Sequence, residues 1–184
     1  MYHIPNDRRA LCSAERLYQG LMECLKTERL TDVTVIETVR KSGVGRSTFY
    51  RLFDTVVDIL VWHCERMIQE GIRRAELADD RSMRTSFLFF ASAWTEHRRL
   101  LEALLENERM DILYSAHGKY MSEISGIFLT EHDMNPEQEA YLSALMVAII
   151  PAVFQVWIQH PEYRAEDLYD RLRDGIGMLQ VLFS

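Results

Sequence analysis

The sequence predicts an all-α fold, and three observations carry that prediction. Apolar residues recur at spacings of three and four along most of the 184 residues, as on one face of a helix. No segment alternates apolar and polar residues between turn signals, as a half-buried strand does. The chain has 8 Gly and 4 Pro, with 48% hydrophobic and 27% charged residues. This composition is typical of a folded globular protein and not of a disordered or fibrous one.

The first expected helix covers about residues 7–28. Its apolar positions form one stripe at helical spacing: Ala14, Leu17, Tyr18, Leu21 and Leu25. A short helix is expected next, over about residues 34–42. Thr34 and Glu37 have the spacing of a capping box at its start, and Gly43 tolerates the left-handed backbone at its end.

A second short helix is expected over about residues 46–52, opened by Gly45. Phe49 and Phe53 fall on its inner face, and Val44 fills the interior of the turn before it. Two short helices joined by a glycine-containing turn, after a longer first helix, are the outline of a helix-turn-helix unit.

The rest of the chain continues in helical periodicity. The expected helices cover about residues 55–78, 83–94, 98–106, 110–130, 136–160 and 165–183. Pro136 suits a helix start, whereas Pro151 lies inside a helix and should bend it. The most apolar run, residues 142–158, is 17 residues long and is interrupted by Pro151 and Gln155. We therefore expect a buried helix there and not a membrane span.

Charge is distributed unevenly along the chain. Residues 1–53 hold nine Lys and Arg against six Asp and Glu, a net +3, whereas residues 54–184 carry a net −10. A basic first third is compatible with contact to phosphates, although chance could produce such a split. The three cysteines, Cys12, Cys24 and Cys64, are expected to be core thiols in a reduced compartment. The amino terminus lacks the pattern of a secretory signal, so we expect a cytoplasmic protein.

The residues around the two short helices form a specific pattern. It consists of Leu30-Thr-Asp-Val-Thr-Val35, then Lys41-Ser-Gly-Val-Gly-Arg-Ser-Thr-Phe-Tyr-Arg-Leu-Phe53, then Asp58-Ile-Leu60. This pattern resembles the amino-terminal region of the TetR family of bacterial transcriptional regulators, over roughly residues 8–62. The sequence departs from this pattern in two places: Val56 stands where the family commonly has a Lys that touches phosphate, and Thr38-Val39 stand where it favours Ile-Ala.

The resemblance implies a helix-turn-helix DNA-binding head in residues 1–53 and a helical ligand-sensing and dimerisation body in residues 54–184. The helix over about residues 55–78 would link them. It also implies a homodimer that binds a palindromic double-stranded DNA operator and responds to a small-molecule effector of unknown identity.

The chemistry of the short helices agrees with that implication. A recognition helix enters the major groove by its amino-terminal end, and the planar guanidinium of Arg46 can bond two acceptors of guanine. Hydroxyl, phenol and guanidinium groups further along suit phosphate oxygens. The predicted DNA-contacting residues are Thr34, Gly45, Arg46, Ser47, Thr48, Tyr50, Arg51 and Thr55.

Two further sites are predicted in residues 54–184. An apolar stripe near the carboxyl end predicts a dimer interface formed by Leu168, Leu172, Ile176 and Leu179, and the alternative is packing within one subunit. Aromatic and polar residues at helical spacing predict a ligand pocket formed by Phe87, Phe90, Trp94, Tyr114, His117 and Met121. A strip of small residues, Gly118, Ser122 and Gly126, is expected beside this pocket. The alternative for the pocket residues is plain core.

Enzymatic functions have little support, because the sequence contains no zinc-binding, nucleophile-elbow or phosphate-loop motif. We expect no cofactor, no metal site and no membrane partner. The leading hypothesis is a sequence-specific DNA-binding regulator, most simply a ligand-responsive repressor. The alternative is an all-α regulator of the same fold that works mainly through a protein partner, as an activator or co-regulator.

Overall fold

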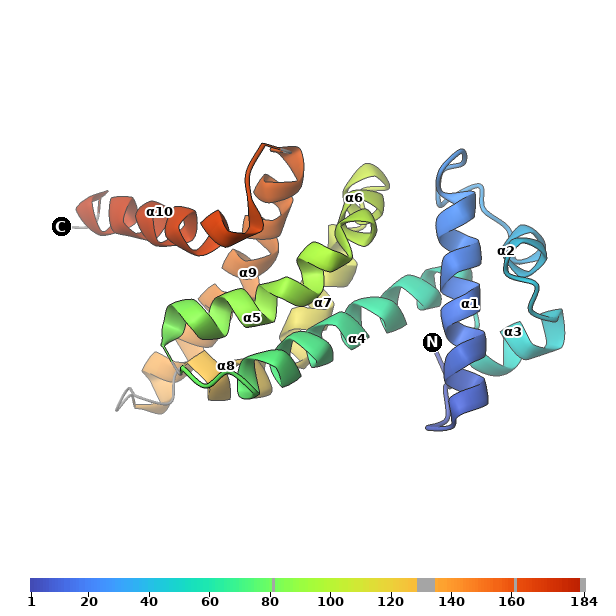
Figure 1. Ribbon diagram of the computed structural model, residues 1–184, viewed down its shortest axis with the longest axis horizontal. Coiled ribbons are helices and arrows are strands. Elements are labelled where there is room, and N and C mark those ends of the chain that lie inside the picture. Colours follow the sequence, from blue (N-terminus) through green and yellow to red (C-terminus); the bar gives the residue numbers. More distant parts are fainter. Residues whose placement is uncertain (81, 129–134, 161, 183–184) are drawn as a thin grey trace. The chain divides into compact units, whose positions relative to one another are not determined.

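The computed structural model describes residues 1–80, 82–128, 135–160 and 162–182. Within these residues the regular structure is helical, apart from one bridge between Tyr2 and Phe53. The all-α prediction is therefore confirmed. The elements, labelled in Figure 1, are α1 Arg8–Cys24, α2 Val35–Ser42, α3 Arg46–Leu52, α4 Val56–Glu76, α5 Met83–Glu96, α6 Arg98–Glu106, α7 Met110–Lys119, α8 Met121–Phe128, α9 Pro136–Gln159, the 3-10 turn η1 Ala165–Asp167, and α10 Leu168–Leu182.

The chain divides into two compact units. The first, called the head, comprises Met1–Arg66 and Ala103–Ile112, and the second, called the body, comprises Met67–Glu102 and Leu113–Ser184. Helix α4 contributes residues to both units, as do α6 and α7. The predicted domain boundary after residue 53 stays a prediction.

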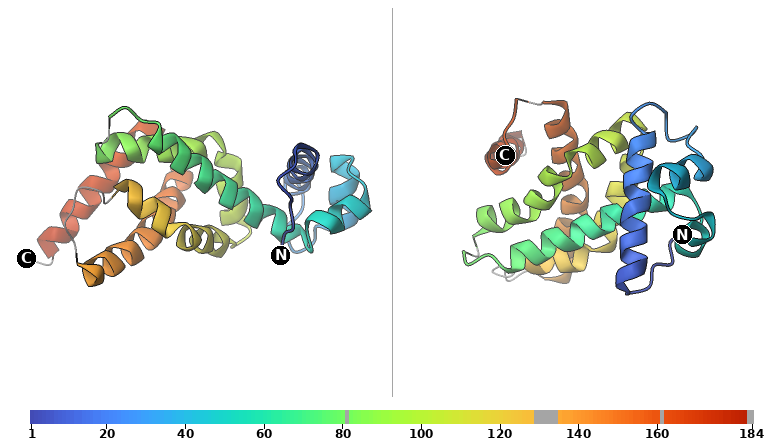
Figure 2. Two further views of the ribbon diagram at one scale, coloured as in Figure 1. Left: turned by 90° about the horizontal axis from the view of Figure 1, so that it is seen from below. Right: turned by 45° about the vertical axis from the view of Figure 1, so that its right-hand side comes forward.

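In the head, α2 and α3 both lie on one side of α1, as the views in Figures 1 and 2 agree. Their apolar faces meet in a closed core whose fully buried side chains include Leu17, Leu21, Phe49, Leu52 and Phe53. Burying a side chain of this kind contributes roughly 1.5–3 kcal/mol relative to leaving it exposed. Short helices such as α2 and α3 are marginal in water by themselves, so this packing holds them in place.

A glycine sets how closely α1 and α2 approach. A Cβ at Gly20 would lie 2.7 Å from the Ser42 Cβ and 2.7 Å from the Thr38 carbonyl oxygen. Thr38, one of the two departures from the TetR pattern, is fully buried, and its hydroxyl donates to the Thr34 carbonyl at 3.0 Å. The unexpected polar residue is therefore accommodated within α2 itself.

The core of the body contains a cluster of aromatic rings. Phe90 and Trp94 of α5, His117 of α7 and Phe154 of α9 are all fully buried. Helices α4 and α5 approach closely at Gly71, where a Cβ would lie 2.8 Å from the Phe90 carbonyl oxygen.

Three expected helix boundaries differ from those observed. The first helix ends at Cys24 and not near residue 28, because the Thr27 and Glu28 amides both turn back to the Cys24 carbonyl. The single helix expected over residues 110–130 is two helices, α7 and α8, separated at Tyr120. The break follows Gly118, a residue with low helix propensity. The last helix starts at Leu168, after η1, and residues 129–130 and 183 lie outside the described part.

Helix α9 is not the buried helix that the sequence predicts. By length and composition alone it could cross a membrane, with a mean hydropathy of 2.0 over its most apolar 18 residues, yet only 28% of that window is buried. Leu145 and Val156 are 55% and 52% exposed. Periodicity located the helix, but much of its apolar surface is exposed in the part of the chain that the structure describes.

Candidate nucleic-acid interface

The turn between α2 and α3 has the geometry that its sequence predicts. Gly43 ends α2 with φ 64° and ψ 20°, in the left-handed region that glycine adopts without steric cost. Val44 is 8% exposed and its amide donates to the Ser42 hydroxyl at 3.1 Å. Gly45 then starts α3 in an extended conformation. The buried Val44 and its hydrogen bond fix the turn, so the start of α3 has a defined position.

Helix α3 separates an apolar inner face from a polar outer one. Phe49 and Leu52 are fully buried. The residues predicted to meet DNA lie on the other side: Gly45, Arg46, Ser47, Tyr50 and Arg51 are exposed, and Thr48 is half-buried. The outer face carries two guanidinium groups and no carboxylate within α3, so its charge suits a polyanion.

Two side chains on this face contact each other. The Arg46 guanidinium carbon lies 5.6 Å from the centre of the Tyr50 ring, a cation–π distance. Tyr50 is 48% exposed, so this contact leaves the guanidinium donors open to solvent. Tyr50, one helical turn away, therefore orients the Arg46 side chain and leaves its hydrogen-bond donors available to another partner.

Two of the three threonines in the predicted DNA-contacting set, Thr34 and Thr55, have structural roles. The Thr34 hydroxyl donates to the Glu37 carboxylate at 2.6 Å and accepts from the Glu37 amide at 3.2 Å. The bonds from Thr34 lower the pKa of Glu37. Thr55 makes the same pair with Asp58, at 2.9 and 3.4 Å. A hydroxyl has one proton to donate, so in this arrangement neither threonine donates to a phosphate.

The amino-terminal residues reach the junction between α3 and α4. The His3 amide donates to the Leu52 carbonyl at 2.8 Å, and the Asp54 amide donates to the Met1 carbonyl at 3.1 Å. The Met1 ammonium lies 3.0 Å from Asp54 and 2.8 Å from Asp58, which raises its pKa. The segment fastens the end of α3 to the start of α4.

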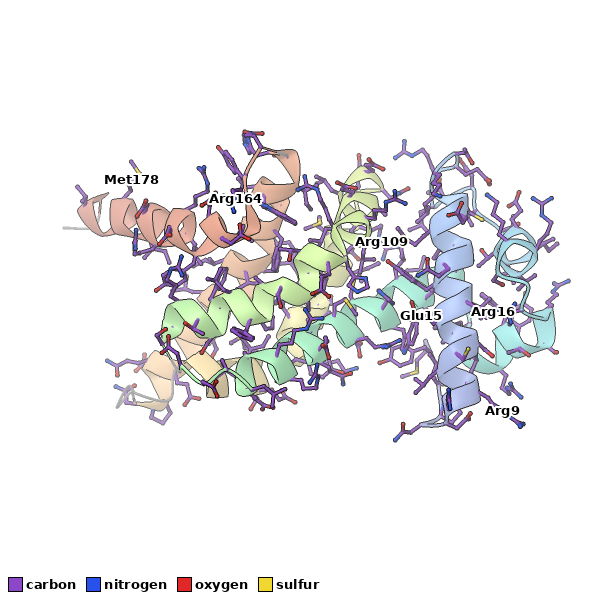
Figure 3. All side chains as sticks on the ribbon, viewed as in Figure 1. Arg9, Glu15, Arg16, Arg109, Arg164 and Met178 are labelled. Atoms are coloured by element: carbon purple, nitrogen blue, oxygen red, sulfur yellow. The ribbon has the colours of Figure 1, made fainter. Side chains whose placement is uncertain are left out.

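Arg16 of α1 contacts the turn between α2 and α3, and the sequence did not predict this contact. Its guanidinium donates to the Gly43 carbonyl at 3.4 Å. The two residues are 27 positions apart, so helical spacing does not relate them. Figure 3 shows Arg16 on the side of α1 that faces α2 and α3, and Glu15 on the opposite side. There Glu15 accepts from Arg66 at 2.9 Å.

In the body, the structure brings three of the six predicted pocket residues together. The His117 ring lies 5.9 Å from Trp94 and 6.1 Å from Phe90, centre to centre. Phe87 is buried too, but its ring contacts Tyr169 at 5.8 Å. Met121 is buried and Tyr114 is half-buried. The pocket assignment stays a prediction.

The expected strip of small residues does not border this cluster. Gly118, Ser122 and Gly126 are exposed, and a Cβ at Gly118 or Gly126 would meet nothing within 4 Å. They lie one position beyond the buried stripe, on the solvent side of α7 and α8. The expectation that the strip lies beside the pocket is therefore wrong.

A groove of about 560 Å³ lies between α9 and α10 of the body. Its lining is almost wholly apolar, apart from Arg171, whose guanidinium stacks on Tyr163 at 3.6 Å. Three predicted dimer residues, Leu168, Leu172 and Ile176, line it. The Leu179 side chain lies outside what the structure describes. Met178 of α10, labelled in Figure 3, is 73% exposed.

Among the described residues, no three His, Cys, Asp or Glu side chains gather closely enough to hold a metal ion. The described cysteines are free thiols: Cys24 and Cys64 are buried as expected, whereas Cys12 is exposed, so its assignment to the core is wrong. Burial raises the pKa of the Cys64 thiol, so it stays protonated and unreactive.

Solved structures share this fold. Lin0861 from Listeria innocua aligns with a TM-score of 0.73 at 12% identity, over 96% of this chain and 96% of that one. The dihydroxyacetone kinase operon activator DhaS aligns at 0.64 and 12%, over 93% and 98%. A TetR transcriptional regulator from Streptococcus agalactiae aligns at 0.61 and 16%, over 90% and 94%. No protein-family model and no curated protein matches the sequence. The chain has the fold of TetR regulators.

Proposed function

We propose that this chain is a cytoplasmic, non-enzymatic transcriptional regulator that binds DNA sequence-specifically. It acts as a homodimer on a palindromic operator and represses until an effector binds. One observation carries the proposal: α3 presents Arg46, Ser47, Tyr50 and Arg51 to solvent over a fully buried apolar face. An exposed, basic, rigidly seated helix start is what direct reading of a major groove requires.

The base-reading role of Arg46 is tested by substitution. We expect Arg46→Ala to relax the preference at one base pair of each half-site, at a cost of about 1–3 kcal/mol, because a bidentate guanine contact is lost. Selection of bound sequences from random oligonucleotides, followed by titrations on single-base variants, measures this. Arg164→Ala in the body, also an exposed arginine, is the control. Equal weakening on every sequence would show that Arg46 contacts phosphate only.

The dimer is proposed on the exposed apolar surface of α9 and α10. The apolar groove, which Ile176 helps to line, and the exposed Leu145 of α9 together make more apolar surface than a soluble monomer ordinarily leaves uncovered. A two-fold protein also matches a two-fold operator.

A double charge substitution tests that interface. We expect Leu172→Asp with Ile176→Asp to give folded monomers in sedimentation velocity, because two carboxylates cannot be buried unpaired. Leu77→Asp, at a 66% exposed apolar position outside the groove lining, should leave the dimer intact. A dimer that persists in the double variant, with helical content unchanged, would place the interface elsewhere.

One observation favours the alternative of a regulator that works through a protein partner. Residues 54–58, at and just before the start of α4, include Asp54, Val56 and Asp58 and no basic side chain, which weakens one expected phosphate contact. A salt titration of operator binding separates the two functions. A DNA-reading protein loses affinity steeply with salt, with a slope set by the number of phosphates neutralised. A flat dependence would favour the protein partner.

Effector response is proposed for the aromatic cluster of Phe90, Trp94 and His117 in the body. Small-molecule sites are lined mainly by apolar and aromatic side chains with a few polar groups, and this cluster has that composition. A ligand shifts the regulator between states only if it binds one of them more tightly.

A further inference from the structure

The aromatic cluster of the body contains two buried polar atoms that nothing in the described structure satisfies. Trp94 Nε1 and His117 Nε2 are both inaccessible to solvent, and neither has a hydrogen-bond partner among the described residues. Both side chains are fully buried, and their rings stack at 5.9 Å and 25°. Buried polar groups are almost always hydrogen-bonded, so two orphans in one contact call for an explanation.

The hydrogen-bonding roles of the two atoms follow from their surroundings. His117 Nδ1 lies 2.9 Å from the Leu113 carbonyl oxygen, and a carbonyl can only accept, so Nδ1 carries the proton. Burial lowers the pKa of His117 to about 4, so the ring is neutral near pH 7. Nε2 is therefore an acceptor, whereas the indole N–H of Trp94 can only donate.

The buried surroundings exclude a charged ligand group. The buried polar side chains of the described body are Ser86, His117 and Ser125, and no Lys, Arg, Asp or Glu of the body is among its buried residues. A carboxylate would accept from Trp94 but find no buried cation, and an ammonium could donate to His117 but would find no buried anion. A hydroxyl satisfies both orphans, since its oxygen accepts and its proton is donated.

We propose that the effector is an uncharged, largely apolar alcohol or phenol whose hydroxyl accepts from Trp94 Nε1 and donates to His117 Nε2. This deepens the proposed effector response and rests on it. Phe90 and Phe154 supply the apolar walls, since the Phe154 ring lies 5.7 Å from Trp94 and the Phe90 ring lies 6.1 Å from His117. Because the rings already contact one another, the ligand binds as the cluster opens, and this difference in affinity is what a switch needs.

The opening would reach α4 directly. The Phe90 backbone is pressed against Gly71, where a Cβ would lie 2.8 Å from the Phe90 carbonyl oxygen. Displacement of Phe90 therefore acts on α4, a helix that contributes residues to both units.

The experiment uses the full-length protein with phenol as probe and toluene and benzoate as matched controls. Indole ¹H–¹⁵N resonances of the three tryptophans are recorded during each titration, and Trp94→Phe assigns the Trp94 signal. We expect phenol to bind roughly tenfold more tightly than toluene, a difference of about 1.4 kcal/mol, and benzoate not to bind. Phenol should also move the Trp94 indole signal downfield as its N–H gains an acceptor.

Trp94→Phe removes the donor and keeps an aromatic ring. We expect it to bind toluene as before and to lose the preference for phenol. The wild-type readout stands without this variant: a ¹⁵N shift at His117 Nε2 on adding phenol reports the second hydrogen bond. Equal binding of phenol and toluene, no binding of either, or an unmoved Trp94 signal would each overturn the proposal. Operator binding without phenol is measured separately, so failure of DNA binding and failure of the ligand site are distinguishable.

Discussion

Helix α1 of the head and the body part of α7 have matching ingredients and different surroundings. Helix α1 contains Gly20 and lies against the buried His63 of α4, whereas α7 contains both Gly118 and the buried His117. In the head, His63 stacks on Tyr18 at 3.5 Å and lies 3.9 Å from the Glu15 carboxylate, while Gly20 is in tight contact with α2. In the body, His117 Nε2 is unsatisfied within the described structure and Gly118 faces open space. The packing around Gly20 leaves no room at this contact of the head, whereas Gly118 of the body has open space beside it.

The largest expected effect is that of acid, which should destabilise the protein through His117 of the body. The pKa of His117 falls from 6.5 to about 4 in the folded state, so the unfolded chain binds the proton first. The free energy of unfolding should therefore decrease as the pH falls from 6.5 toward about 4, by about 3 kcal/mol in total. Urea unfolding across this range measures the effect.

The variant His117→Gln supplies the reference for that measurement. It lacks the titrating ring, so its stability should depend less steeply on pH in the same window, whatever its absolute stability. Equal slopes in wild type and variant would contradict the lowered pKa.

Adding a methyl group at Gly20 should destabilise the head. A Cβ there would meet the Thr38 carbonyl oxygen and the Ser42 Cβ at 2.7 Å and the Ser42 amide at 2.8 Å. Two of these are backbone atoms that cannot step aside, so we expect Gly20→Ala to destabilise the protein by about 1–3 kcal/mol and to weaken DNA binding. Thermal unfolding and operator titration test this. Unchanged stability would mean that α1 and α2 can separate freely.

The same substitution in α7 should have the opposite sign and the smallest effect. Gly118 is in a helix and exposed, with nothing within 4 Å of an added Cβ. Gly118→Ala should stabilise the protein by about 0.5–1 kcal/mol, because alanine loses less backbone entropy on forming a helix. A rise in the thermal midpoint checks this, and a fall would show that the surface of α7 is covered in solution.

The parts of the fold that were predicted correctly depend on local signals. Thr34 with Glu37, and Gly43 with its left-handed backbone, mark the ends of α2 within a few residues of sequence, and all are observed. The exposure of Arg46 and the burial of Phe49 also follow from helical spacing. These features were predictable because each depends on neighbours one turn away.

The errors arose where the outcome depends on distant neighbours. Spacing placed Gly118 close to His117 but could not show that the adjacent strip faces solvent. It located α9 without showing that only 28% of its most apolar window is buried. The contact of Arg16 with the Gly43 carbonyl joins residues 27 positions apart, and only the packing of α1 on the turn creates it.

The shortness of α3 has a consequence for how much sequence one head can specify. Its 7 residues extend about 10 Å at 1.5 Å per residue, which matches the rise of about three base pairs at 3.4 Å each. A sequence of three base pairs recurs by chance throughout any genome, so a single half-site competes with an enormous excess of other sites. Under the proposed function, one reading helix therefore carries too little information to mark a promoter. Only two half-sites at a fixed spacing, each read by one helix, would be rare enough to mark a promoter.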